Sequence, residues 1–224
     1  MSIGRNPLYY GNARDPKKFM KAISRLSGIF ATVLGLAAVA CAQQSLPAQA
    51  VNTGTAARPP AFEFKGVPTG EKAPDFSAFT IDEKKVNLSD LKGKVVILDF
   101  WASWCGPCQV SMPGLEKIYQ QIKDKGVVVL SLNTWDQKPD FKEWMGKNAG
   151  TKYHFNFVRD PAEGDRAGIR KASIAKRLYK VPGIPTMYVI DRDGKIAGSF
   201  VGSGNEQSLV DILAKLNIKA TAPK

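Results

Sequence analysis

A Cys-Gly-Pro-Cys turn constrains this chain more than any other feature of its sequence. Cys105 and Cys108 follow the strand-like apolar run 95–101 and open the helix-like stretch 109–125. A helix N-terminus favours the thiolate of a cysteine placed there. A second cysteine one turn further on lies close enough to attack a mixed disulfide that the first has formed. The spacing therefore predicts a redox-active dithiol at a strand-to-helix turn.

Half of a zinc site is the alternative for this cysteine pair. A structural zinc ion takes about four nitrogen or sulfur ligands. The chain offers one further cysteine, Cys41, and one histidine, His154. The ligand count therefore favours redox chemistry without a metal, and we expect His154 to be a partly packed structural residue.

The formal net charge of +12 raises the question of nucleic-acid binding, but its distribution argues against it. The first 41 residues hold six Lys or Arg and only one Asp, and bases mix with acids along most of the remaining chain. The main exception runs from Arg166 to Lys180. This run is either a solvated helix face or a docking patch for an acidic partner.

The N-terminal region has the pattern of an export signal. Basic residues in Lys21–Arg25 precede the uncharged apolar run Ile29–Ala40, which has the length of a signal-peptide core. It is too short to cross a bilayer, which takes about 20 residues. Met20 stands directly before the basic segment, so we expect it to be the natural start.

Two processing routes compete at the end of this segment. Ala38-Val39-Ala40-Cys41 resembles a lipoprotein box, in which Cys41 is acylated after cleavage, although Ala38 stands where Leu is usual. Ordinary signal-peptidase cleavage after Ala42 or Ala50 is the alternative. We favour acylation. Either route places the mature protein outside the cytoplasmic membrane of a bacterium. The two routes differ in that only acylation anchors the protein to the membrane, through the lipid on Cys41.

The chain divides into three predicted parts. Residues 1–41 form the N-terminal extension and signal segment. Residues 42–61 are rich in Ala, Gln, Thr and Pro without hydrophobic periodicity, which predicts a flexible linker. Residues 62–224 form the folded domain.

Within that domain the pattern alternates between strand-like and helix-like runs. Asp82-Glu83 and Asp191–Gly194 stand between paired strand-like runs, as hairpin turns do. Pro113 should kink its helix, and Ser173 is placed to cap one. The order predicts an α/β fold, one mixed central sheet with helices on both faces. The expected strands are 76–81, 85–88, 95–101, 127–132, 155–158, 186–190 and 195–201, and the expected helices are 109–125, 140–147, 173–179 and 209–216.

Four motifs between residues 73 and 216 resemble, in their order, those of the TlpA/ResA-like thioredoxins, which are envelope thiol:disulfide oxidoreductases. They are Ala-Pro-Asp-Phe at 73–76, Leu-Ser-Asp-Leu-Lys-Gly-Lys at 88–94, Trp-Cys-Gly-Pro-Cys at 104–108 and Val-Pro-Gly-Ile-Pro-Thr at 181–186. The resemblance implies a thioredoxin-like fold with an N-terminal β-hairpin and an insertion at 135–155. It implies no cofactor other than the redox-active disulfide.

The resemblance also implies roles for the residues of the turn. Cys105 matches the attacking cysteine and Cys108 the resolving cysteine. Gly106 and Pro107 form the dipeptide that helps to set the redox potential. Trp104 either belongs to the substrate-docking surface or simply packs.

Pro185, in the Ile184-Pro185 dipeptide, matches the family's cis-proline, which lies opposite the cysteines and lets an extended substrate segment pair with the backbone.

Asp99 is a departure from the family, which commonly has Asn there and a Glu at the position of Ser111. A buried aspartate at this place in cytoplasmic-type thioredoxins helps to take the proton from the resolving thiol. We therefore assign Asp99 a proton-shuttle role, with a structural aspartate as the alternative. Trp135 either lines the rim of the site or packs.

We thus expect a protein-disulfide reductase of the bacterial cell envelope. The resemblance implies clients of the apocytochrome c type and a membrane electron donor of the CcdA/DsbD type, with no nucleic acid as a partner. The alternatives are a thioredoxin-fold peroxidase (a redoxin), a thiol oxidase or isomerase and, outside the enzymes, a partner-binding lipoprotein.

Overall fold

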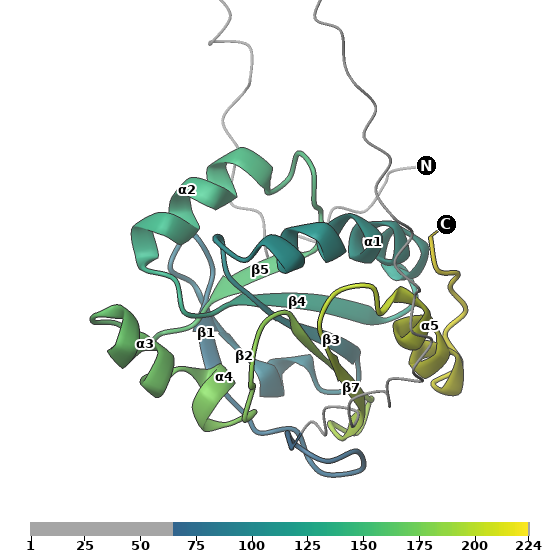
Figure 1. Ribbon diagram of the computed structural model, residues 1–224. Helices are drawn as coiled ribbons and strands as arrows, with labels where there is room; N and C mark the ends of the chain where they lie inside the picture. The colour runs from purple at the N-terminus through teal and green to yellow at the C-terminus, as the bar shows by residue number, and fades with distance from the viewer. Residues whose placement is uncertain (1–64, 224) are drawn as a thin grey trace, which may run out of the picture. The chain divides into compact units, whose positions relative to one another are not determined.

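The computed structural model describes residues 65–223. The predicted signal segment, the linker, Met20 and Cys41 lie outside the described residues. Figure 1 shows one twisted sheet with helices packed on both of its sides.

The sheet has the strand order β2-β1-β5-β4-β3-β6-β7. β3, β4 and β5 run parallel, and β6 and β7 are antiparallel to their neighbours. β1 pairs antiparallel with both β2 and β5. The predicted mixed α/β sheet is confirmed, and the structure shows that this sheet is open. Its strands are β1 (Ser77–Phe79), β2 (Lys85–Asn87), β3 (Val95–Trp101), β4 (Val127–Asn133), β5 (Asn156–Arg159), β6 (Thr186–Ile190) and β7 (Ile196–Val201).

Helices occupy both faces of this sheet. Buried side chains of α1, α2 and α5 join one hydrophobic cluster, and those of α4 and the 3-10 turn η2 join the cluster on the opposite face. The elements are η2 (Leu88–Leu91), α1 (Gly106–Ile122), α2 (Lys138–Asn148), α3 (Arg166–Ala172), α4 (Ile174–Arg177) and α5 (Glu206–Lys215).

The central strand β3 positions the functional turn. All seven of its residues are buried, as its continuously apolar sequence predicts. Side chains alternate between the faces of a strand. Ile97 and Trp101 accordingly join the cluster beneath α1, whereas Leu98 and Phe100 join the opposite one. Asp99 shares the face of Ile97 and Trp101, which is the face that α1 covers.

Two glycines allow α5 to approach its neighbours closely. A Cβ on Gly114 would lie 2.6 Å from Glu206 Oε1, and a Cβ on Gly198 would lie 2.6 Å from Ile212 Cδ1. A larger residue at either position would therefore require the side chain of Glu206 or Ile212 to move. This packing holds α5 against the helix that carries the cysteines.

Hydrogen bonds attach the segment before β1 to the face of the sheet opposite α1. Tyr179 Oη donates a hydrogen bond to Pro74 O at 2.8 Å, and Asp75 Oδ1 accepts one from Ser89 N at 3.0 Å. The motifs 73–76 and 88–94 therefore contact each other in the fold, through the hydrogen bond between Asp75 and Ser89.

The boundaries of several elements differ from the prediction. α1 starts at Gly106, three residues early, and continues through Pro113 to Ile122. The strand expected at 155–158 runs from Asn156 to Arg159.

The helical region after β5 shows the largest difference. Ser173 does cap a helix, accepting the Lys176 N–H at 3.2 Å, but that helix, α4, is only four residues long. A separate helix, α3, precedes it, begun by Asp165 accepting the Gly168 N–H. The sequence gives no periodic signal for α3 because Ile169 is its only buried residue.

Candidate active site

The cysteine pair lies at the N-terminus of α1. Cys105 is the N-cap residue, and its Sγ accepts a hydrogen bond from Cys108 N at 3.2 Å. Pro107 occupies the first turn, where a missing backbone N–H costs the helix nothing. The two cysteines form a disulfide across a Cα–Cα distance of 5.3 Å. The predicted redox pair is therefore present, and the helix end that favours the Cys105 thiolate is in place.

The cysteines themselves are buried in this oxidised form. Cys105 is 3% exposed and Cys108 is 1% exposed. In the disulfide form, little of Cys105 is left at the surface. Its sulfur turns inward to bond Cys108, and the surface of the turn belongs to Gly106, Pro107 and Trp104, which is 57% exposed.

The turn that carries Pro185 borders the cysteine helix. The Ile184–Pro185 peptide bond is cis. It directly precedes β6, whose first residue Thr186 pairs with Phe100 near the end of β3. Pro185 and Ser111, one turn after Cys108, both line a cavity of about 20 Å³, which is room for about one water molecule.

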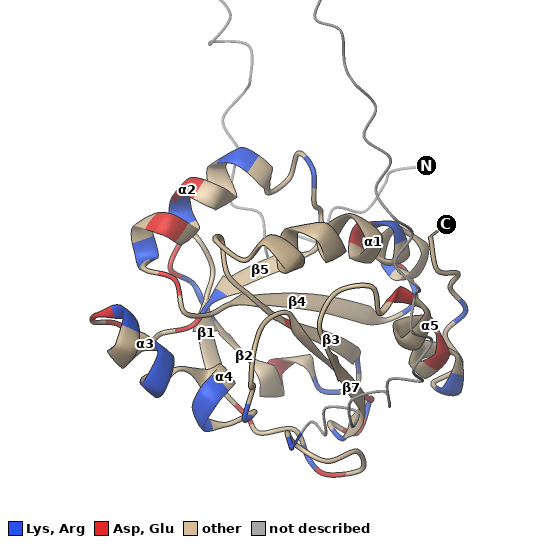
Figure 2. Cartoon of the chain, viewed as in Figure 1, with Lys and Arg blue, Asp and Glu red and all other residues tan. Residues whose placement is uncertain are grey.

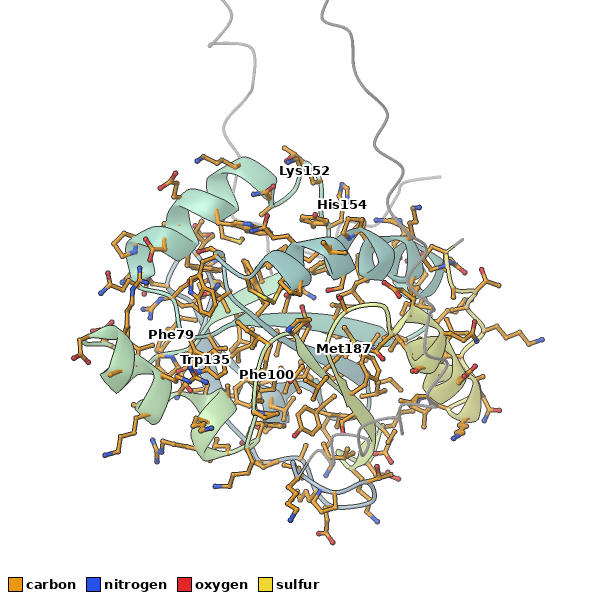
Figure 3. The ribbon with its side chains drawn as sticks, viewed as in Figure 1. Phe79, Phe100, Trp135, Lys152, His154 and Met187 are labelled. Atoms are coloured by element: carbon orange, nitrogen blue, oxygen red, sulfur yellow. A yellow bond between two sulfur atoms is a disulfide. The ribbon has the colours of Figure 1, made fainter. Side chains whose placement is uncertain are left out.

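Asp99 lies beneath this assembly in the middle of β3. It is 3% exposed, and its Oδ2 accepts a hydrogen bond from Ser131 Oγ at 3.0 Å. Burial raises its pKa to about 7, against the opposing effect of the Ser131 hydrogen bond. Its register partner on β6 is Met187, which lines the same small cavity and is labelled in Figure 3. A carboxyl group that titrates near neutral pH is thus enclosed on the face that α1 covers.

Sequence reasoning missed Asp136, which braces the loop that leads to the cysteines. Its Oδ2 accepts hydrogen bonds from Ser103 N and from Asn133 Nδ2, both at 2.7 Å. Burial raises the pKa of Asp136, and these hydrogen bonds oppose that rise. The only signal in the sequence is the position of this acid just after a buried strand, where the strand's carboxyl end meets the active-site edge of the sheet.

Two other residues singled out from the sequence have structural surroundings. Trp135 is buried, donates from Nε1 to Ser173 Oγ at 3.0 Å and packs beneath Arg170, so it lies on the α3 side of the sheet (Figure 3). His154 Nδ1 lies 2.8 Å from Glu116 Oε1, and its backbone N–H donates to Glu116 Oε2. Trp135 therefore packs in the interior and does not line the rim of the site. His154 connects the loop after α2 to α1 through its contacts with Glu116.

Two kinds of feature are absent from residues 65–223. No group of three or more His, Cys, Asp or Glu side chains in this range could hold a metal ion. Within the same range, no helix is both long enough and apolar enough to cross a membrane.

Comparisons with known proteins agree with this geometry. The model of the redoxin family matches residues 68–215, and the chain belongs to that family. It is 33% identical over 147 residues to the thiol-disulfide oxidoreductase ResA of Bacillus cereus, covering 66% of this chain and 78% of the relative.

Two crystal structures show the same fold. A chain assigned as the thiol:disulfide interchange protein DsbE of Chlorobium tepidum superposes with a TM-score of 0.57 at 33% identity, over 67% of this chain and 98% of the other. The exposed lipoprotein thioredoxin Etrx1 of Streptococcus pneumoniae superposes with a TM-score of 0.51 at 30% identity, over 64% of this chain and all of the other. The fold is therefore thioredoxin-like, and the protein is a thiol-disulfide oxidoreductase whose redox centre is the Cys105–Cys108 disulfide.

In the reduced protein we predict that Cys105 reacts with iodoacetamide before Cys108 and does so below the ordinary thiol pKa of about 8.5. The helix N-terminus and the Cys108 N–H both favour the Cys105 thiolate. Alkylation as a function of pH, with the labelled peptides separated by mass spectrometry, measures both rates. Faster labelling of Cys108 would reverse the roles of the two cysteines.

Replacing Asp136 by Ala should loosen the active-site loop. The Ser103 N–H and the Asn133 amide both lose their acceptor, which we expect to cost about 1–3 kcal/mol of unfolding free energy. Urea melts measure the cost, and hydrogen exchange at Ser103 should accelerate. Asp124→Ala, at an exposed position after α1, is the control and should change neither. Unchanged exchange at Ser103 in Asp136→Ala would show that the loop does not depend on this carboxylate.

Proposed function

We propose that this redoxin-family chain works as a reductase, passing two electrons from its Cys105–Cys108 dithiol to disulfides of proteins in the bacterial cell envelope. The observation that carries the proposal is the placement of a Gly-Pro cysteine pair at the start of a helix, with Cys105 as the cap. The same dipeptide occurs in thioredoxin, a reductant with a potential of about −270 mV.

The reaction proceeds through a mixed disulfide. The Cys105 thiolate attacks one sulfur of the client disulfide, which releases the client's other sulfur as a thiolate. Cys108, once deprotonated, attacks the Cys105 sulfur, closes the enzyme disulfide and releases the second client thiolate. The client gains two electrons, and the protein is left in the oxidised form of this structure. A membrane donor of the CcdA/DsbD type then returns it to the dithiol.

Cis-Pro185 and the exposed Trp104 provide the docking surface in this proposal. The backbone beside the cis bond is placed to pair with an extended client segment, as an added strand does. Trp104 is 57% exposed beside the disulfide, and Val110, on the first turns of α1, is 73% exposed. These side chains offer apolar contact to residues flanking the client's cysteines.

Asp99 acts as the proton acceptor for Cys108 in this proposal. Support comes from its place on the face covered by α1 and from a pKa raised to about 7 by burial, which suits proton exchange at neutral pH. Met187, the register partner of Asp99 on β6, and Ser111 of α1 both line the water-sized cavity, so a water bound there would lie next to the neighbours of this carboxylate.

The client class that we propose is an oxidised apocytochrome c, whose haem-binding Cys-x-x-Cys-His pair must be reduced before haem attachment. Support for this client class is the order of the four sequence motifs, which resembles the order found in the TlpA/ResA-like proteins.

We further propose that acylated Cys41 tethers the domain through the linker 42–61. The likeness to an exposed lipoprotein thioredoxin supports the tether.

No observation favours the other enzyme classes. A thioredoxin-fold peroxidase uses one peroxidatic cysteine after a Thr- or Pro-rich turn, whereas both cysteines of residues 65–223 lie in one redox pair. An intact pair at a helix N-terminus also argues against a purely partner-binding lipoprotein. A thiol oxidase would use the same site in the opposite direction, and its potential separates it from a reductase.

Asp99→Asn should stabilise the fold and slow the exchange reaction. The folded-state pKa of about 7 lies above the unfolded value near 3.9. The wild-type protein therefore loses stability as pH rises from about 4 to 7, and the loss levels off above that range. The amide cannot ionise, so the variant should lack this dependence and be a few kcal/mol more stable at about pH 8.

Denaturant melts at about pH 4 and pH 8 measure the stability, and insulin reduction measures the rate, which we expect to fall by about tenfold or more. Ser131→Ala is the control, because it removes the hydrogen bond and leaves the carboxylate. An Asn variant that is equally fast and no more stable at pH 8 would leave Asp99 a structural residue.

Cys108→Ser should trap client proteins on Cys105, because the resolving attack is lost. We expect mixed disulfides that are released by dithiothreitol, with Cys-x-x-Cys-His proteins among them when envelope extracts are used. Cys105→Ser is the matched control and should trap far less. Trapping through Cys108 in that control would contradict the assigned roles, and clients without haem-binding motifs would contradict the apocytochrome class.

The mature N-terminus should be a lipid-modified Cys41. Mass spectrometry of protein purified from a bacterial host measures the mass of the N-terminal peptide. An unmodified N-terminus at Gln43 or Val51 would instead mean ordinary signal-peptidase cleavage and a soluble envelope protein without the tether.

A further inference from the structure

The edge of the molecule that carries the disulfide has almost no charge of its own. Residues 100–115, which include the cysteine turn and the first turns of α1, contain no Asp, Glu, Lys or Arg. Recognition of a charged client must therefore come from neighbouring elements. Those neighbours are α2 on one side and the α3–α4 region on the other (Figure 1).

The two neighbours differ in charge. α2 mixes bases and acids, and two of its lysines are paired: Lys147 with Glu143, and Lys138 with Glu83 at 3.0 Å. The α3–α4 region instead gathers bases, as the blue segments of Figure 2 show. We call its six exposed bases the basic surface: Arg166, Arg170, Lys171, Lys176, Arg177 and Lys180.

Few acidic side chains neutralise the positive charge of the basic surface. None of its six side chains takes part in an ion pair among those formed within residues 65–223. Of the acids nearest in sequence, Asp165 caps α3 through Gly168 N, and Glu163 lies 3.9 Å from Arg159. Asp160 is buried and accepts the Ile174 N–H. An excess of positive charge is left facing solvent.

Chain connectivity holds this surface near the reactive disulfide. Lys180 is five residues before cis-Pro185, and an extended chain spans at most about 3.6 Å per residue, or about 18 Å in all. The Debye length is about 8 Å at physiological ionic strength and about 30 Å at 0.01 M. A client at the cis-proline turn is therefore within the low-salt Debye length of Lys180, which is the end of the basic surface nearest to that turn in the sequence.

One of the six bases is also held in place. The Arg170 guanidinium lies 4.5 Å from the centroid of the Trp135 ring, and Trp135 is anchored in turn to Ser173. Stacking of this kind fixes a guanidinium while leaving its donors available to a carboxylate. The basic surface therefore combines one arginine held over an aromatic ring with five other exposed bases.

We propose that the basic surface docks an acidic segment of the client, lying beside the disulfide that the client presents to Cys105. The proposal rests on the oxidoreductase function and adds a specificity to it: among clients, those with Asp or Glu close to their cysteines are favoured. Charge complementarity of this kind acts mainly on the rate of encounter and weakens with salt.

Two synthetic peptides test the proposal with the reduced full-length chain. They share one intramolecular disulfide, which is flanked by glutamates in the first peptide and by lysines in the second. In a single turnover the peptide disulfide is reduced while Cys105–Cys108 forms, so no external donor is needed. We expect faster reduction of the acidic peptide at about 10 mM ionic strength, with the preference largely lost at about 150 mM.

Matched variants locate the effect. The test variant combines Lys171→Gln, Lys176→Gln and Arg177→Gln, which leaves the stacked Arg170 intact. The control combines Lys117→Gln on α1, Lys215→Gln at the end of α5 and Lys219→Gln beyond α5, all at exposed positions, and so removes the same net charge. The test variant should reduce the acidic peptide about tenfold more slowly at low salt, and the control should not. Equal slowing of both variants, or no preference in the wild type, overturns the proposal.

Binding without chemistry separates this proposal from the reductase function. An acidic peptide with both cysteines replaced by serine should bind the wild type more tightly than the test variant, by fluorescence anisotropy. If that difference holds while no peptide is reduced, the docking surface stands and the reductase function fails. Retained peptide binding in the test variant, together with loss of its sedimentation with anionic lipid vesicles, would assign the surface to a membrane and overturn the proposal.

Discussion

Burial of β3 on both faces fixes where the reactive disulfide lies. The strand pairs with β4 and β6, and helices cover it on both faces of the sheet. This packing fixes the position of its carboxyl end at one edge of the sheet. The chain turns there into α1, and Cys105 becomes the cap of that helix. The reactivity of the site is therefore a consequence of helix-end electrostatics imposed by the packing of the sheet.

Asp99 places a carboxyl group in the middle of the same strand. Six of the seven residues of β3 are apolar, and an ionised carboxylate among them is unfavourable because burial removes its hydration. A single hydrogen bond from Ser131 offsets part of that cost. Burial raises the pKa of this carboxyl to about 7, which suits the proton transfer from Cys108 that we propose. This buried acid also distinguishes the chain from the Asn-bearing pattern of the TlpA/ResA-like proteins that it otherwise resembles.

The parts of the fold that could be predicted are those in which burial leaves a clear hydrophobic pattern. The bounds of β3 and β6 match the expected runs because both strands are wholly buried and apolar except for Asp99 in β3 and Thr186 in β6. α3 was not predicted, because a helix that buries only Ile169 leaves no periodic hydrophobic pattern in the sequence. The Asp136 brace was not predicted either, since one acid after a strand has no distinguishing pattern and its partner Ser103 is 33 residues away. Burial of Cys105 depends on which way its sulfur turns, which composition and spacing do not determine.

The potential of the Cys105–Cys108 couple tests the central claim most directly. Equilibration of the full-length chain with glutathione or dithiothreitol buffers, followed by alkylation and mass analysis, measures it. Transfer of electrons to client disulfides requires a strongly reducing couple, and the account predicts a value near that of thioredoxin, about −270 mV. A value near that of the oxidant DsbA, about −120 mV, would contradict it, because the same site would then oxidise its clients.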